Sequence, residues 1–240
     1  MTLDPGTDVA RVLAVTAHPD DVDFGAAASI ASWTAVGIEV AYCIVTNGDA
    51  GGFDPSVPRS EIAAIRQAEQ RAAAKVVGVD DVTFLGHPDG RVTPSIELRR
   101  DIARVIRRVR PDRVLAQSPD RNWQRIFASH PDHLATGEAT LSAVYPDSRN
   151  PFAFPELLEE GLEAWTVRDV WVMGTEHPDR FVDVTDFYDR KAAALREHVS
   201  QLPGVDDLDG LLKQWLGFQA AAAGLPEGRY AEAFRYVGTT

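Results

Sequence analysis

Short apolar runs alternate with segments of helical period along most of this chain. Strands are predicted at 11–17, 39–48, 82–86, 112–120 and 169–174, and helices at 24–37, 59–78, 95–109, 130–145, 187–201 and 207–223. The helix at 59–78, for example, has apolar or alanine residues at helical spacing and closes on Gly78. Strands that alternate with helices build a mostly parallel sheet with helices on both faces. We therefore predict a single α/β domain, with a surface excursion at about 145–168 that forms a rim of the site.

The charge balance argues against a nucleic-acid partner. The 240 residues include 24 Lys and Arg against 36 Asp and Glu, a formal net charge of −12, whereas phosphate binding needs clustered basic side chains. The N-terminal segment lacks the basic start and apolar core of a signal peptide, and no run approaches the roughly 20 apolar residues of a membrane span. We therefore expect a cytoplasmic protein without membrane insertion. Because Cys43 is the only cysteine, any metal must use His, Asp and Glu.

The tripeptide His-Pro-Asp occurs four times and contains four of the six histidines. It begins at His18, His87, His130 and His177. Each copy follows a predicted strand, and segments that leave the carboxyl ends of parallel strands build the site of such folds. Glycines flank the second copy and favour a tight turn, although its Asp89 could instead contact a substrate. No second histidine lies near His177, so we interpret that copy as an exposed turn.

The first copy lies in the stretch AHPDDVDFG at 17–25. His18 and Asp21 can converge on a metal if the chain turns between them, which leaves Asp20 free to act as a base. Adjacent carboxylates beside a histidine are costly unless a cation neutralises them. The alternative is a helix cap in which Asp21 or Asp23 caps the following helix. We favour the metal, because a cap needs one acid and this run has three.

The third copy lies in SHPDH at 129–133. His130 and His133 are three residues apart, so they share a face on the first turn of a helix. The alternative is an exposed helix start with polar residues. One His–Asp pair with one distant histidine makes three protein ligands, the number found in catalytic zinc sites that keep a position open for water.

Six motifs in this chain carry a family resemblance. They are AHPDDVDFG at 17–25, TNGDAGG at 46–52, RSEIAAIRQAEQRAAAKVVGV at 59–79, FLGHPDG at 84–90, SHPDH at 129–133 and YAEAFRYV at 230–237. Together they resemble the PIG-L/LmbE-like family of zinc-dependent N-deacetylases over nearly the whole chain. The resemblance implies a Rossmann-like sheet, one deacetylase domain over 1–240 and a small N-acetylated substrate of the amino-sugar type.

The resemblance also implies a role for matching residues. His18, Asp21 and His133 would bind Zn²⁺, or Fe²⁺ or Co²⁺ in its place. Asp20 would be the general base that takes a proton from the attacking water. The resemblance gives His130 a contact with the oxyanion and makes it one candidate for the acid that protonates the leaving group. Asp132 would orient a neighbouring histidine, and Arg66 and Asp89 would contact the substrate.

Two other functions fit the same residues. An amidase would cleave a larger acyl group or a thiol conjugate, with an acyl pocket drawn from Trp123, Phe127 and residues 145–161. A sugar-binding module with a vestigial metal would bind ligand without releasing acetate. The resemblance also points to a homo-oligomer, because relatives often assemble as trimers or hexamers.

Overall fold

One sheet organises the molecule. The computed structural model describes residues 2–3 and 8–239, with side chains at 8–126 and 128–239. In this part of the chain eight strands follow the order β1-β7-β8-β6-β5-β2-β3-β4. They are β1 (Thr2–Leu3), β2 (Arg11–Thr16), β3 (Glu39–Thr46), β4 (Asp81–His87), β5 (Arg113–Gln117), β6 (Asp169–Met173), β7 (Arg180–Asp183) and β8 (Ala231–Gly238). Only β8 is antiparallel to its neighbours, β6 and β7, so the prediction of a mostly parallel sheet is confirmed.

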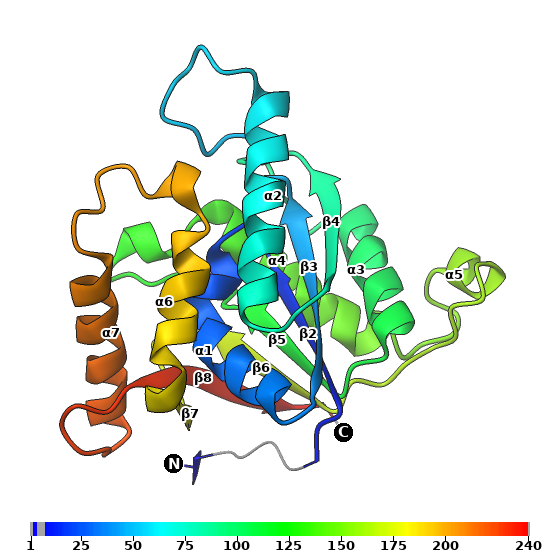
Figure 1. Cartoon of the computed structure of the whole chain (residues 1–240). Helices are drawn as coiled ribbons and strands as arrows, with labels where there is room; N and C mark the ends of the chain where they lie inside the picture. Colours follow the sequence, from blue (N-terminus) through cyan, green and yellow to red (C-terminus); the bar gives the residue numbers. More distant parts are fainter. Residues whose placement is uncertain (1, 4–7, 240) are drawn as a thin grey trace.

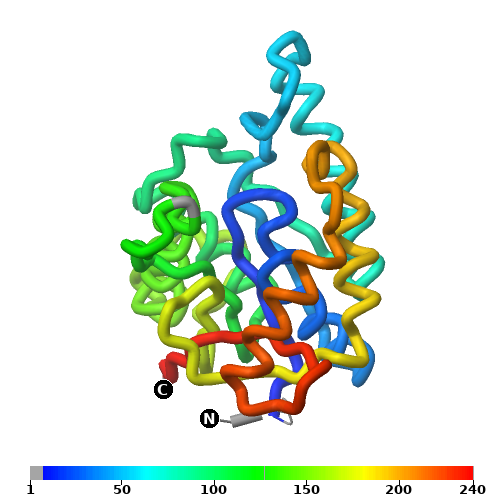
Figure 2. The backbone as a smooth tube through the Cα atoms, turned by 90° about the vertical axis from the view of Figure 1, so that its left-hand side faces the viewer, coloured from blue at the N-terminus to red at the C-terminus, as the bar shows by residue number. Residues whose placement is uncertain are grey.

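Helices cover both faces of this sheet. They are α1 (Asp21–Ala35), α2 (Arg59–Val76), α3 (Ile96–Val109), α4 (Pro131–Ser142), α5 (Pro155–Glu159), α6 (Tyr188–Arg196) and α7 (Leu208–Ala222). Helices α1, α2 and α6 lie on one face and α3 and α4 on the other, while α7 packs against α6 (Figure 1). The loop at 47–58 projects from one end of the molecule, and β8 lies at the opposite end (Figure 2). None of the described helices is long and apolar enough to span a bilayer.

The central strands β2, β3, β5 and β6 are buried on both sides, as their apolar sequences predict. Along β2, Val12 and Ala14 pack with the core that includes α1, whereas Leu13 and Val15 pack with the core that includes α3 and α4. Successive side chains of a strand point to opposite faces, so a strand between two helical layers must be apolar at every position.

The order of the strands creates a switch point between β2 and β5. From β2 the chain moves outward through β3 to β4, and then returns so that β5 pairs with the other side of β2. The segments that follow β2 and β5 therefore turn to opposite faces and leave a crevice at the carboxyl ends of the strands. His18 comes directly after β2, and His130 comes after β5 and a short 3₁₀ turn at Ile126–Ala128.

Helix α1 begins earlier than the sequence indicates. We predicted its start at residue 24, but it begins at Asp21, with Asp20 at the N-cap position and no side-chain cap. The alternative in which Asp21 or Asp23 caps the helix is therefore wrong. Both carboxylates belong to the first turn of the helix, where they can point into the crevice or into the core.

The segment 145–168 also differs from expectation. It packs around α3, where the buried Arg107 guanidinium donates to carbonyl oxygens between residues 147 and 162. Leu157 of α5 is buried in the same core as α3. Among the described residues, none of this segment lines the cleft beside the histidines. The segment therefore completes the domain's packing, and the expectation that it forms a rim of the site is wrong.

Candidate metal centre

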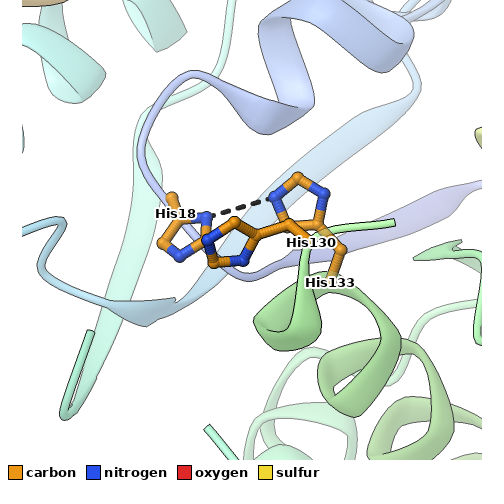
Figure 3. A group of neighbouring side chains, drawn as sticks. All are labelled: His18, His130 and His133. Carbon is orange, nitrogen blue, oxygen red and sulfur yellow. Dashed lines mark hydrogen bonds between the residues drawn. The ribbon is translucent and has the colours of Figure 1, made fainter. Parts of the chain in front are cut away.

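Ligand-type atoms of three residues meet at the switch point. Nδ1 of His18 lies 3.2 Å from Nε2 of His133 (Figure 3) and 3.3 Å from Oδ2 of Asp21. Nε2 of His133 lies 3.0 Å from Oδ1 of Asp21. Asp21 is the first residue of α1, so its side chain can reach back to His18. Its Oδ2 also accepts the amide of His18 at 2.7 Å. His133 comes from the first turn of α4, so the cluster joins two distant parts of the chain.

The spacing and the charge of this cluster both fit a metal ion. With metal–ligand distances near 2.0–2.1 Å, neighbouring ligands of a tetrahedral zinc are roughly 3.3 Å apart, close to the distances found here. Burial lowers the pKa of His18, but hydrogen bonds to Asp132, Asp21 and Asp89 raise it to about 12. A site that holds a proton so strongly carries excess negative charge, which a divalent cation would neutralise.

The other nitrogen of His18 faces two carboxylates. Its Nε2 lies 3.2 Å from Oδ2 of Asp132 and 3.1 Å from Oδ1 of Asp89. Asp132 also accepts the amides of Gly90 and Val92, and Asp89 that of Ala50. A ring that donates to a carboxylate keeps its opposite nitrogen free for a metal. Both acids thus hold the imidazole so that its Nδ1 faces His133 and Asp21. The predicted contact of Asp89 with substrate stays a prediction.

His130 lies beside the cluster with a defined tautomer. It occupies the N-cap position of α4, where its Nδ1 accepts the amide of Asp132 at 3.2 Å. An accepting Nδ1 places the proton of the neutral ring on Nε2. The ring centroid lies 4.9 Å from that of His18 and 5.1 Å from that of His133. Burial and these two neighbouring histidines lower the pKa of His130, which favours the neutral form with Nε2–H as donor.

Asp20, which precedes the ligand-type residue Asp21, forms an ion pair with Arg66. Oδ2 of Asp20 lies 3.1 Å from Nη2 of Arg66. Burial and the charge of Asp21 raise the pKa of Asp20 to about 6, against the lowering effect of Arg66. The guanidinium is buried and also donates to the carbonyls of Gly48 and Pro19. Arg66 therefore holds the Asp20 turn, and its predicted contact with substrate stays a prediction.

Two glycines of the TNGDAGG motif make room for Arg66. A Cβ on Gly51 would lie 2.1 Å from Nη1 of Arg66, and a Cβ on Gly48 would lie 2.7 Å from the same atom. Gly48 also has φ +69°, a conformation that disfavours other residues. The close approach of the loop to the guanidinium explains the glycines at positions 48 and 51 of the motif.

A cleft of about 510 Å³ opens beside the cluster. Asp21 and His133 lie in its wall, together with Trp215 and Phe218 of α7. Polar residues from the segments after β5 and β6 complete it, including Asp120, Asn122, Arg125, Thr175 and Glu176. A pocket of this size, mostly apolar with a few polar groups, is typical of small-molecule sites.

Comparison with known proteins identifies the family. The family model for PIG-L, described as GlcNAc-PI de-N-acetylase, matches residues 13–144. Diacetylchitobiose deacetylase of Thermococcus kodakarensis is 34% identical over 235 residues, which cover 98% of this chain and 85% of that protein. The chain belongs to the PIG-L family. All eight predicted site residues lie within the matched range. Two groups of potential ligand atoms, His18 with His130 and His133 and His18 with Asp89 and Asp132, together with the family support a bound metal.

Solved structures agree on the fold of this PIG-L chain. The N,N'-diacetylchitobiose deacetylase of Pyrococcus horikoshii, complexed with its inhibitor MPG, superposes with a TM-score of 0.89 at 31% identity and covers 99% of this chain and 88% of that one. GalB, the 4-carboxy-2-hydroxymuconate hydratase of Pseudomonas putida, superposes with a TM-score of 0.78 at 21% identity and covers 96% of this chain and 97% of that one. The second likeness shows the fold alone.

The other two His-Pro-Asp copies of the PIG-L chain do not add a histidine to the cluster. His87 pairs with Asp101 of α3 at 3.1 Å, so the second copy contributes only its aspartate. His177 is exposed and lines a neighbouring hollow of about 280 Å³ with Trp123. The side chain of Phe127, which we expected near an acyl pocket, lies outside the described residues.

Sequence reasoning missed the buried polar residues behind the cluster. His198, Gln70, Lys191 and Glu232 are all at most 1% exposed and hydrogen-bond to Asp20 or to residues of α1. Glu232 stands in the motif YAEAFRYV and Gln70 in the motif at 59–79, so the motifs marked both positions without indicating a role. Nothing in the sequence around Lys191 and His198 indicated that they are buried and hydrogen-bonded, because their partners lie far away in the sequence.

Proposed function

We propose that this PIG-L chain removes the acetyl group from an N-acetylated amino sugar with a divalent metal, Zn²⁺ by preference. The observation that carries the proposal is the triangle of His18, Asp21 and His133 atoms, 3.0–3.3 Å apart at the edge of a substrate-sized cleft. Two imidazoles and one carboxylate suit zinc, although Fe²⁺ and Co²⁺ accept the same donors. The deacetylases among its relatives support this choice of substrate.

The residues around the triangle have complementary roles in this reaction. A bound divalent ion supplies Lewis acidity, which polarises the acetamide carbonyl and lowers the pKa of water. Asp20 takes the proton of the attacking water, and its pKa of about 6 suits a group that must also return a proton. His130 donates Nε2–H to the carbonyl oxygen as negative charge develops there. The leaving amine then takes back the proton that Asp20 accepted from water, which yields acetate and a free amine.

Metal analysis and amine release test the proposal together. Purified protein should contain about one metal ion per chain and should release acetate and amine from N-acetylglucosamine or N,N'-diacetylchitobiose. Chelation should abolish turnover, and Zn²⁺ should restore it. Asp20→Asn should keep the metal and lose at least about 100-fold in kcat, because general-base catalysis contributes roughly 10²–10⁴-fold. A metal-replete variant with near-normal kcat would remove Asp20 from the mechanism.

The same assay separates the two other functions. A series of substrates with longer acyl groups measures acyl preference, and higher kcat/KM for a long acyl chain than for acetyl would identify an amidase. Tight sugar binding without acetate release, in protein with full metal content, would identify a binding module.

A further inference from the structure

Asp20 has a backbone conformation that needs support. Its φ is 84° and its ψ −29°, in the left-handed region. A non-glycine residue in that region is strained and persists where its surroundings hold it. The turn sets where the carboxylate of Asp20 lies, so whatever holds the turn also places the proposed base.

Helix α2 holds this turn at two points. Oε1 of Gln70 accepts the amide of Asp20 at 2.8 Å. Nη2 of Arg66 donates to the carbonyl of Pro19 at 2.8 Å and to Oδ2 of Asp20 at 3.1 Å. Arg66 and Gln70 are four residues apart and therefore share one face of α2. Arg66 contacts the carboxylate itself, whereas Gln70 contacts only the backbone of Asp20.

The orientation of the Gln70 amide is determined by its second partner. Nε2 of Gln70 donates to Oδ2 of Asp23 at 2.8 Å, and the same oxygen lies 2.9 Å from Nε2 of His198. A carboxylate only accepts, so Nε2 must face Asp23 and Oε1 must face the Asp20 amide. Gln70 and Asp23 are fully buried and His198 is 1% exposed. At such burial the loss of a hydrogen-bond partner is costly, which favours the chain of hydrogen bonds from His198 through Asp23 to Gln70.

We propose that Gln70 is a positioning residue for the general base, and that Asp23 and His198 orient it. The proposal rests on the proposed function, in which Asp20 is that base. Gln70 acts through the Asp20 amide and not on the metal ligands. Asp21 has its own support, because its Oδ2 accepts the amide of His18 at 2.7 Å. Loss of the Gln70 hydrogen bond should therefore displace the base and leave the metal bound.

The test is Gln70→Met, which keeps the length of the side chain and removes both hydrogen bonds. We expect kcat for N,N'-diacetylchitobiose to fall at least tenfold, with KM and zinc affinity within about threefold of the wild type. Gln67→Met is the matched control on the same helix, since the only side chain that hydrogen-bonds Gln67 among the described residues is Arg71. It should leave kcat unchanged. A parallel loss of zinc affinity and kcat in Gln70→Met would overturn the proposal.

A double-mutant cycle with Asp20→Asn shows whether Gln70 acts through Asp20. If it does, Gln70→Met should cause little further loss of kcat in the Asp20→Asn background, because the base is already gone. An equal loss in both backgrounds would indicate general structural damage and overturn the proposal. If Gln70→Met does not fold, His198→Leu replaces it in the cycle, with His198→Gln as the conservative variant expected to keep most of the activity.

Amide hydrogen exchange of Asp20 provides a readout that does not need activity. The Asp20 amide should be protected in the zinc-loaded wild type and should exchange at least tenfold faster in Gln70→Met or His198→Leu. Unchanged exchange would overturn the positioning role even if kcat falls. If the wild type releases no amine from any substrate, the proposed function fails, and faster exchange would still support the hold of Gln70 on the turn.

Discussion

Asp132 shows how much of the site depends on one side chain. It accepts from His18 and from the amides of Gly90 and Val92, so it ties the segment after β4 to α4 and to a proposed metal ligand. Asp132 and His18 are buried, where an unpaired donor is expensive. The family resemblance implied that Asp132 orients a histidine, and we propose that this histidine is His18, whose Nε2 lies 3.2 Å from Oδ2 of Asp132.

Asp132→Asn should lower metal affinity about 10–100-fold, the usual cost of losing the partner of a metal-bound histidine. The asparagine has one acceptor oxygen for three donors, and its amide nitrogen repels the Nε2–H of His18. Zinc affinity, measured by competition with a chelating dye, checks the prediction. Asp101→Asn is the control, because Asp101 makes a comparable contact with His87 at 3.1 Å outside the cluster. Equal affinities of both variants for zinc would contradict the prediction.

At the scale of elements, helix α4 must lie close to β5 to deliver its histidines. A Cβ on Gly137 would come within 2.4 Å of the carbonyl oxygen of Gln117, a backbone atom that cannot turn aside. Gly137 is one turn after His133, on the same face of α4. The distance from helix to strand therefore sets the position of His133 relative to His18.

Gly137→Ala should reduce both stability and zinc affinity, because the methyl group pushes α4 away from β5 and carries His133 with it. Gly217→Ala is the control within helix α7, where a Cβ would meet no atom within 4 Å. It should be neutral or more stable by up to about 1 kcal/mol, since alanine is the better helix former. Thermal unfolding and zinc titration of both variants test this prediction, which fails if Gly137→Ala keeps normal values in both.

Across the whole molecule, one buried ion pair connects elements from the two ends of the chain. Nζ of Lys191 in α6 lies 2.6 Å from Oε1 of Glu232 in β8. Lys191 also donates to the carbonyls of Asp23 and Phe24 in α1. Glu232 accepts amides one turn further along α1, those of Ala28 and Ser29. The pair thus anchors the helix that carries Asp21, and both side chains are at most 2% exposed.

Glu232→Ala should lower the free energy of unfolding by about 3–5 kcal/mol, because it leaves the Lys191 charge buried without a partner. The double variant Lys191→Met/Glu232→Gln removes both charges and keeps an acceptor for the α1 amides, so it should recover more than half of that loss. Chemical denaturation of metal-free protein measures both values. A double variant no more stable than Glu232→Ala would show that the charge pair is not the source of the loss.

The whole fold does not by itself determine the reaction. A hydratase shares it with a TM-score of 0.78, so function must be argued from the site. The site of this chain consists of the His18, Asp21 and His133 triangle and Asp20, all within the residues 13–144 that match the family. The α7 wall of the cleft, with Trp215 and Phe218, lies outside that range.

Local pattern in the sequence was sufficient for β2 to β6 and for six of the helices but missed β8 and α5, and it proposed a ligand set. Apolar runs predict strands because both faces of the sheet are covered, and His18, Asp21 and His133 were accessible because short spacing and a family motif mark them. The same pattern placed the start of α1 three residues late, since the left-handed turn at Asp20 is stabilised by α2 and not by its own neighbours.

Tertiary structure alone determined which side chain meets which. Asp89 faces His18, Gln70 faces Asp20, and His198 faces Asp23 across 175 positions of the chain. Each contact depends on how far apart two packed elements lie, and helix period or strand alternation says nothing about that distance. Buried polar groups need partners, but a sequence shows only that a partner must exist, and the packing of α1, α2 and β8 selects it.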